Sequence, residues 1–129
     1  MMPMAEDNDT FPTFTFVVKG RPPLPGSDLS DLDRARTRLQ GKISEQTGDN
    51  AFFPIPATIP VSLKFLFFHP SDMDRPSMMD CMDSTREICM GILYSDNTDI
   101  LEKKLFIEKA TSDGDYPDGA ILIRVRPML

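Results

Sequence analysis

Residues 61–74 have the sequence VSLKFLFFHPSDMD, an apolar run that ends in two aspartates. The run alternates between apolar and polar residues at its start, and it is apolar on both sides by Phe68. This pattern is typical of a central strand that is covered on both faces of its sheet. We therefore expect a strand from Val61 to Phe68, around which the rest of the fold is arranged.

Two carboxylates, Asp72 and Asp74, follow this strand closely. Successive residues of an extended chain point to opposite sides, so the two acids are expected to point the same way. A third acid, Asp96, follows a helical run, and a helix folded back on the strand would bring it near the pair. Three converging carboxylates suit Mg²⁺, a hard cation that prefers oxygen ligands. Asp72, Asp74 and Asp96 are therefore the candidate metal ligands and catalytic residues.

Two helices are predicted from apolar residues that recur every three or four positions. One helix is expected from Ser27 to Gln46 and the other from Ser77 to Leu93. The side chains that the second helix is expected to turn toward the core are Met78, Cys81, Met82, Thr85, Ile88, Cys89 and Ile92.

Three more strands are expected, at Thr13–Lys19, Leu101–Lys109 and Ala120–Arg126. The polar loop 112–119 suits a hairpin between the last two. The predicted order is β-α-β-α-β-β, which gives an α/β fold: a small single domain with a mixed sheet and two helices.

The chain has 129 residues, a length that suits one domain. We expect this domain at 13–129, after a disordered acidic tail at 1–12 that resembles no targeting signal. No apolar run approaches the ~20 residues that span a bilayer. Cys81 and Cys89 would lie roughly 12 Å apart along one helix, too far for a disulfide. These features favour a reduced intracellular protein, cytoplasmic or nuclear.

The net charge of −6 argues mildly against a nucleic-acid partner, because such binders neutralise phosphates with lysine and arginine. The basic residues are nevertheless grouped in the sequence, and both a local basic face and merely solvated side chains stay open as explanations. The groups are Arg34, Arg36, Arg38 and Lys42, then Lys103, Lys104 and Lys109, and finally Arg124 and Arg126.

Four segments of the chain form a further pattern. They are Phe16–Pro23, Val61–Phe68, Asp72–Asp74 and Leu93–Ile100. In this order they resemble the opening strand and turn, the second strand, the D-x-D motif and the paired-acid segment of the RusA family of Holliday junction resolvases. The resemblance covers roughly residues 13–126.

This resemblance implies a RusA-like fold and a homodimeric, Mg²⁺-dependent endodeoxyribonuclease, a hydrolase that cleaves branched DNA such as four-way junctions during recombination and repair. Asp72, Asp74 and Asp96 would be its metal ligands. Basic side chains would grip the phosphates of the junction, and the candidates for this role are Arg21, Arg75, Lys103 and Lys104.

The chain departs from the RusA pattern at three places. Arg75 stands where the family usually has asparagine, Met78 stands where it has a helix lysine, and the paired acids become Asp96 and Asn97. Methionine cannot stabilise an oxyanion, and asparagine binds metal less strongly than a carboxylate does. If the essential acid corresponds to Asn97, then Asp96 or Asp99 must replace it. The alternative is a catalytically degenerate RusA-like module that binds DNA or protein without cutting.

An unrelated α/β protein is a third possibility, because the acids also have a structural explanation. Ser77 and Asp80 fit a capping box, and Asp72 and Asp74 favour a helix N-terminus. For His69, the single histidine, a role as base or ligand stays open, but a structural or solvent-exposed position is expected, because no catalytic partner for it is evident.

Overall fold

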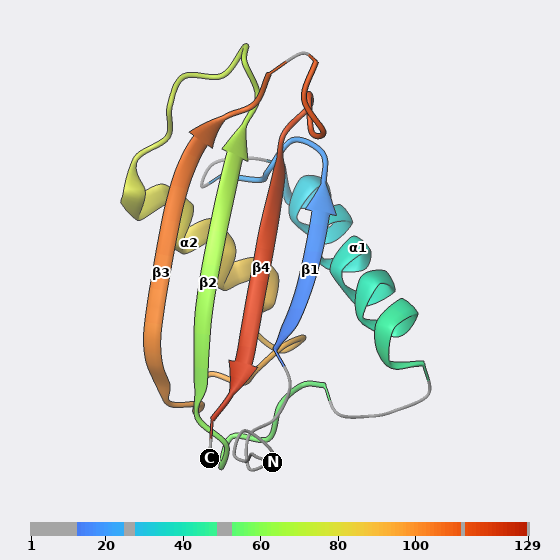
Figure 1. The fold of residues 1–129 in the computed structure, drawn as a ribbon, viewed down its shortest axis with the longest axis vertical. Helices are drawn as coiled ribbons and strands as arrows, with labels where there is room; N and C mark the ends of the chain where they lie inside the picture. The colour runs from blue at the N-terminus through green and yellow to red at the C-terminus, as the bar shows by residue number, and fades with distance from the viewer. Residues whose placement is uncertain (1–12, 25–27, 49–52, 112, 129) are drawn as a thin grey trace, which may run out of the picture.

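The computed structural model describes residues 13–24, 28–48, 53–111 and 113–128. Its elements follow the predicted order, with one mixed four-stranded sheet and two helices (Figure 1), so the predicted fold class is confirmed. The predicted acidic tail at 1–12 lies outside the described residues. The elements are β1 (Phe14–Lys19), α1 (Leu29–Thr47), β2 (Val61–His69), α2 (Met78–Cys89), β3 (Ile100–Lys109) and β4 (Ala120–Pro127).

The strands are ordered β1-β4-β2-β3 across the sheet. β2 pairs in parallel with β3 and antiparallel with β4, and β4 pairs antiparallel with β1. The predicted hairpin between the last two strands is wrong, because β2 lies between them. A parallel neighbour needs a crossover connection. α2 supplies that connection between β2 and β3, and β4 pairs on the other side of β2.

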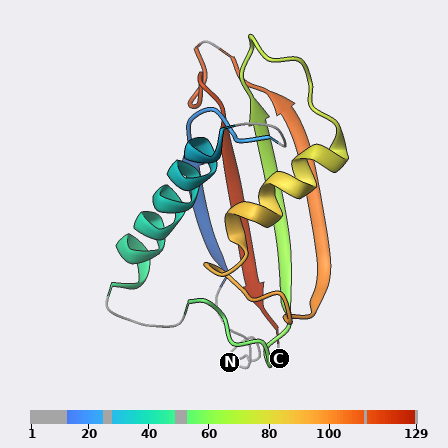
Figure 2. The same cartoon turned by 180° about the vertical axis from the view of Figure 1, so that it is seen from behind.

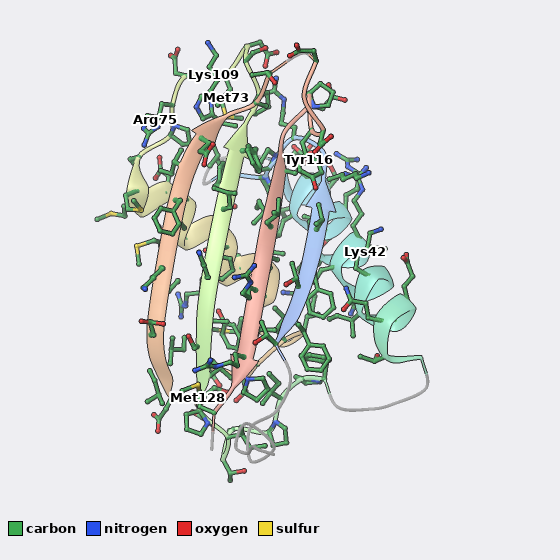
Figure 3. All side chains as sticks on the ribbon, viewed as in Figure 1. Lys42, Met73, Arg75, Lys109, Tyr116 and Met128 are labelled. Atoms are coloured by element: carbon green, nitrogen blue, oxygen red, sulfur yellow. The ribbon has the colours of Figure 1, made fainter. Side chains whose placement is uncertain are left out.

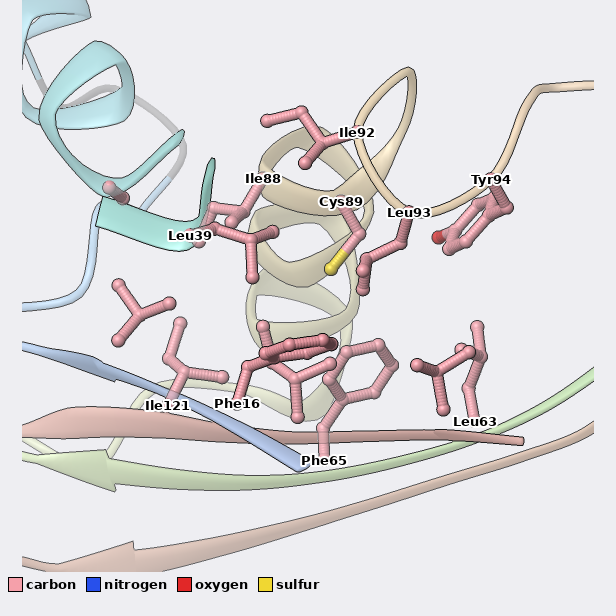
Figure 4. Close-up of a cluster of buried hydrophobic side chains, with 14 of the residues drawn as sticks. Phe16, Leu39, Leu63, Phe65, Ile88, Cys89, Ile92, Leu93, Tyr94 and Ile121 are labelled. Carbon is pink, nitrogen blue, oxygen red and sulfur yellow. The ribbon is translucent and has the colours of Figure 1, made fainter. Parts of the chain in front are cut away.

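Both helices pack against the same face of the sheet, as Figure 2 shows from the helical side. Burial of the apolar side chains between the helices and the strands removes them from water and is the main source of stability. Within the described part, no helix has the length and apolarity needed to cross a bilayer. The largest fully buried side chains of this core (Figure 4) include Phe16, Leu39, Leu63, Phe65, Phe67 and Tyr94.

No helix of the described residues covers the other face of the sheet (Figure 1), and we term this face, which bears Lys64, Leu66 and Phe68, the open face. The prediction that β2 is covered on both faces is therefore wrong. Leu66 and Phe68 are half-buried because their neighbours cover them. Leu66 lies in register with apolar residues on both adjacent strands. The rings of Phe68 and Tyr116 lie 5.5 Å apart between their centroids.

The N-terminus of α2 is capped as predicted, since Ser77 Oγ accepts a hydrogen bond from the backbone N–H of Asp80 at 3.0 Å. The buried face of the helix is rotated from the predicted one, and Met78 and Met82 are exposed to solvent. The residues that α2 buries against the sheet and α1 are Cys81, Ser84, Thr85, Ile88 and Cys89.

α2 also ends at Cys89, earlier than the predicted end at Leu93. A guanidinium from α1 meets its last turn: Arg36 Nη1 donates hydrogen bonds to the backbone oxygens of Glu87, at 2.7 Å, and Met90, at 2.9 Å. α1 thus supplies donors to two carbonyls at the end of the helix, and the carbonyl of Cys89 accepts from the backbone N–H groups of Ile92 and Leu93, so no further helical turn is required.

Candidate functional site

The two aspartates of the D-x-D motif lie in the loop that leaves the C-terminal end of β2. Asp72 accepts two hydrogen bonds from Arg21 Nη2, at 2.9 Å to Oδ1 and 2.8 Å to Oδ2. Both side chains of this ion pair are exposed, so it contributes little stability. It does hold Asp72 against the turn that follows β1. Asp74 is also exposed.

His69 holds the base of this loop. Its side chain is buried, and its Nδ1 lies 3.3 Å from Pro70 O and 3.2 Å from Met73 O. The backbone N–H of Met73 also donates to Pro70 O at 3.0 Å. The histidine is therefore structural, which was one of its two expected roles.

A hollow of about 400 Å³ opens beside the two aspartates. Its lining includes Asp72, Asp74, Arg75 and Lys109. Figure 3 shows Arg75 and Lys109 near Met73, at the end of the sheet where β2 and β3 finish. Carboxylates that adjoin cations offer oxygen ligands for a divalent ion and positive charge for a phosphate.

Asp96 lies at the other end of the sheet. It precedes β3, in a loop tied to the start of β2 by the hydrogen bond from Val61 N to Asp99 O, 2.9 Å. The nine residues of β2 separate this loop from Asp72, a length of about 30 Å. The expected convergence of Asp96 on the D-x-D pair is therefore not found. The physical reason is that the helix of a parallel β-α-β unit returns the chain to the start of the first strand.

No three Asp, Glu, His or Cys side chains within the described residues gather closely enough to hold a metal ion. Asp72 and Asp74 thus stand as candidate ligands without a third carboxylate from the part of the chain that the structure describes. Mg²⁺ is often bound by one or two carboxylates together with substrate phosphates, so the donors of this pair still suit the ion.

The predicted phosphate-binding residues lie on different parts of the surface. Arg21 is paired with Asp72, and Arg75 Nη1 donates to the backbone oxygen of Ile107 on β3 at 3.2 Å. Ile107 belongs to the strand at the edge of the sheet. Both arginines therefore have structural partners at the loop end of the molecule.

Lys103 and Lys104 point to opposite faces of β3, as successive residues of a strand do. Lys103 is half-buried on the side of the helices, with its Nζ 5.7 Å from the centroid of the Phe65 ring. Burial lowers the pKa of its ammonium group. Lys104 lies on the open face, opposite Lys64.

The open face brings together cations that are far apart in the sequence. Lys64 of β2 lies in register with Lys104 of β3 on one side and with Arg124 of β4 on the other. We term Arg124, Lys64 and Lys104 the cation row. With Arg126 they line a hollow of about 520 Å³ on the sheet. Alternation along each strand indicates only that these side chains lie on one face of the sheet. They are neighbours because β2 pairs with β3 and β4 in this register.

The cation row has few acidic partners. Lys104 Nζ lies 3.6 Å from Glu102 Oε2, whereas Lys64 Nζ lies 5.5 Å from the centroid of the Phe106 ring. Arg124 makes no hydrogen bond or ion pair with any residue that the structure describes. Like charges directly opposite each other on adjacent strands destabilise a sheet. An anion bound over the row would relieve this repulsion.

Comparison of the sequence with protein-family models finds no matching family, and comparison with curated proteins finds no match.

Proposed function

We propose that this protein is a DNA-binding module of the RusA type that does not cleave its substrate. The cation row on the open face, with Arg126 beside it, is the observation that carries the proposal. The row extends over about 10 Å on three adjacent strands. Phosphate neutralisation supplies most non-specific affinity for DNA. Glu102, which lines the same hollow and lies 3.6 Å from Lys104, offsets part of this charge and leaves the hollow net positive.

The surroundings of the D-x-D motif support binding without cleavage. Asp72 is engaged by Arg21, and Asp96 lies at the opposite end of the sheet. Met78, at the position of the family's helix lysine, brings no positive charge that could stabilise a transition state.

One observation favours a second candidate function, that of a Mg²⁺-dependent endodeoxyribonuclease that cuts branched DNA as a homodimer. Asp72 and Asp74 line one hollow with Arg75 and Lys109. The two carboxylates would hold Mg²⁺, which lowers the pKa of a bound water for attack on a phosphodiester. Arg75 and Lys109 would stabilise the negative charge of the phosphate.

A fluorescently labelled synthetic four-way junction separates these two candidates. We expect the purified protein to bind it at low salt, to lose affinity as salt rises, and to leave it uncut with Mg²⁺, Mn²⁺ or EDTA. Metal-dependent paired nicks that are lost in Asp74→Asn and kept in a control, Asp33→Asn at an exposed acid of α1, would establish the nuclease instead. If the protein does not bind the junction even at low salt, both candidates are wrong.

A further inference from the structure

The open face presents an aromatic ring beside the cation row. Phe106 lies two residues along β3 from Lys104, so both side chains are on the same side of the sheet. The ring is 48% exposed. Phe106 belongs to a row of apolar residues, aligned by the strand register, which we term the apolar row: Val17, Leu122, Leu66 and Phe106.

The two rows are neighbours on a face that neither of the described helices covers. They are about 7 Å apart along the strands, the advance of two residues. Lys64, at the centre of the cation row, reaches toward the Phe106 ring, with its Nζ 5.5 Å from the ring centroid. Both helices lie behind the sheet, so neither shields these rows from a ligand (Figures 1 and 2).

We infer that the open face is a binding platform for single-stranded nucleic acid, with phosphates on the cation row and bases on Phe106 and the apolar row. The inference rests on the proposed DNA-binding function and names its substrate class. A single strand offers both phosphates and the faces of unpaired bases. A duplex offers this surface its phosphates alone, because its bases are stacked on one another.

Charge and stacking contribute separately to this recognition. Neutralisation of one phosphate changes the slope of log K against log salt by about −0.7 for single strands. The four cations Lys64, Lys104, Arg124 and Arg126 would therefore give a slope of about −3. Stacking of one base on an aromatic side chain strengthens binding roughly 5- to 150-fold.

Fluorescence anisotropy with labelled oligothymidylate, oligouridylate and a mixed-sequence duplex, each about 20 nucleotides long, tests the inference. We expect the full chain to bind at least one of the single strands about 5-fold or more tightly than the duplex, with a salt slope near −3. The two single strands show which sugar the platform accepts, and tight binding of either supports the inference.

Two substitutions at Phe106 isolate the role of the ring. Phe106→Leu keeps an apolar side chain but removes the aromatic face, and we expect it to weaken single-strand binding roughly 5- to 150-fold without affecting the duplex. Phe106→Tyr should retain the affinity. Leu101→Ala, at another exposed apolar residue of β3 outside both rows, is the matched control and should bind like the wild type. Circular dichroism establishes that each variant is folded.

Three results would overturn the inference. Equal affinity for duplex and single strand, with Phe106→Leu harmless, would leave a DNA-binding module that does not recognise bases. Failure to bind any of the nucleic acids at low salt would contradict the proposed function as well. A dimer in sedimentation that Phe106→Leu dissociates and oligonucleotides do not would assign the open face to a second copy of the chain.

Discussion

At the scale of single residues, burial decides what the two thiols can do. Cys89 is fully buried, and desolvation raises the pKa of its thiol to about 12. The pKa of Cys81 is raised to about 11, first by burial and then by the nearby carboxylate of Asp80. Because the thiolate is the reactive form, both cysteines are unreactive packing groups at neutral pH.

The buried thiols predict a loss of stability in alkali. Above pH 9 the thiol of Cys89 ionises in the unfolded chain, while the folded state keeps it protonated up to about pH 12. The folded state then binds more protons, so its stability is fully present below pH 9 and falls as pH rises. Each thiol contributes a slope of up to about 1.4 kcal/mol per pH unit.

Urea unfolding at several values between pH 8 and 10 measures this slope. We expect Cys89→Ala to make the alkaline slope shallower by up to about 1.4 kcal/mol per pH unit, while Cys81 and the buried Tyr94, whose pKa desolvation also raises, continue to contribute. An unchanged slope in the variant would show that Cys89 is not protonated in the folded state at this pH.

At the scale of elements, one side chain joins the two helices. Arg36 of α1 donates to the backbone oxygens of Glu87 and Met90, and so satisfies the end of α2. The predicted end of that helix at Leu93 was wrong. The contact that stabilises the actual end joins residues far apart in the sequence, so the local apolar spacing does not indicate it. The apolar spacing from Cys81 to Ile92 continues past the end that Arg36 stabilises.

We expect Arg36→Leu to lower the free energy of unfolding by about 1–3 kcal/mol, because it removes the donor to the partly buried carbonyl oxygen of Met90. Arg34→Leu is the matched control on the same helix. Arg34 is exposed, and among the described residues it pairs with Asp31 alone, so its loss should change the free energy by less than about 0.5 kcal/mol. Equal effects in urea unfolding would show that the contact from Arg36 to α2 is not stabilising.

The element order was predictable from the sequence, but the arrangement of the elements was not. Alternation in Val61–Phe68 and the cap at Ser77 are local patterns, and both predictions were confirmed. Strand order depends on which strand edges pair, and no local sequence pattern specifies that pairing. The last two strands were therefore wrongly predicted to form a hairpin. Because the strand pairing was not known, Asp96 was predicted to lie beside Asp72. In the parallel β-α-β unit, the loops that carry these two residues are a strand length apart.

At the scale of the whole molecule, charge is distributed unevenly. The chain has a net charge of −6, yet the open face gathers Lys64, Lys104, Arg124 and Arg126 around one hollow. The sequence shows these residues as separate groups, because their proximity is created by the pairing of β2 with both β3 and β4. The net charge of the chain and the local charge of the open face therefore predict opposite changes in folding stability when one cation of this face is removed.

The substitution Arg124→Gln decides which charge dominates. The global charge predicts destabilisation, since the net charge becomes more negative. The local charge predicts stabilisation, since Arg124 lies in register with Lys64. Adjacent strands are about 5 Å apart, within the Debye length of about 10 Å at 0.1 M salt, so we expect the local term to dominate. The gain should be about 0.2–1 kcal/mol at low salt and smaller at high salt.

Arg126→Gln supplies the control for this substitution on the same strand and face. It makes the same change in net charge, but Arg126 lies in register with Ser62 and not with a cation, so no gain in stability is expected. Both variants should weaken nucleic-acid binding and make its salt slope shallower by about 0.7. Chemical unfolding in low and high salt, together with anisotropy, measures both effects. Destabilisation of Arg124→Gln at low salt would show that repulsion within the cation row is not significant.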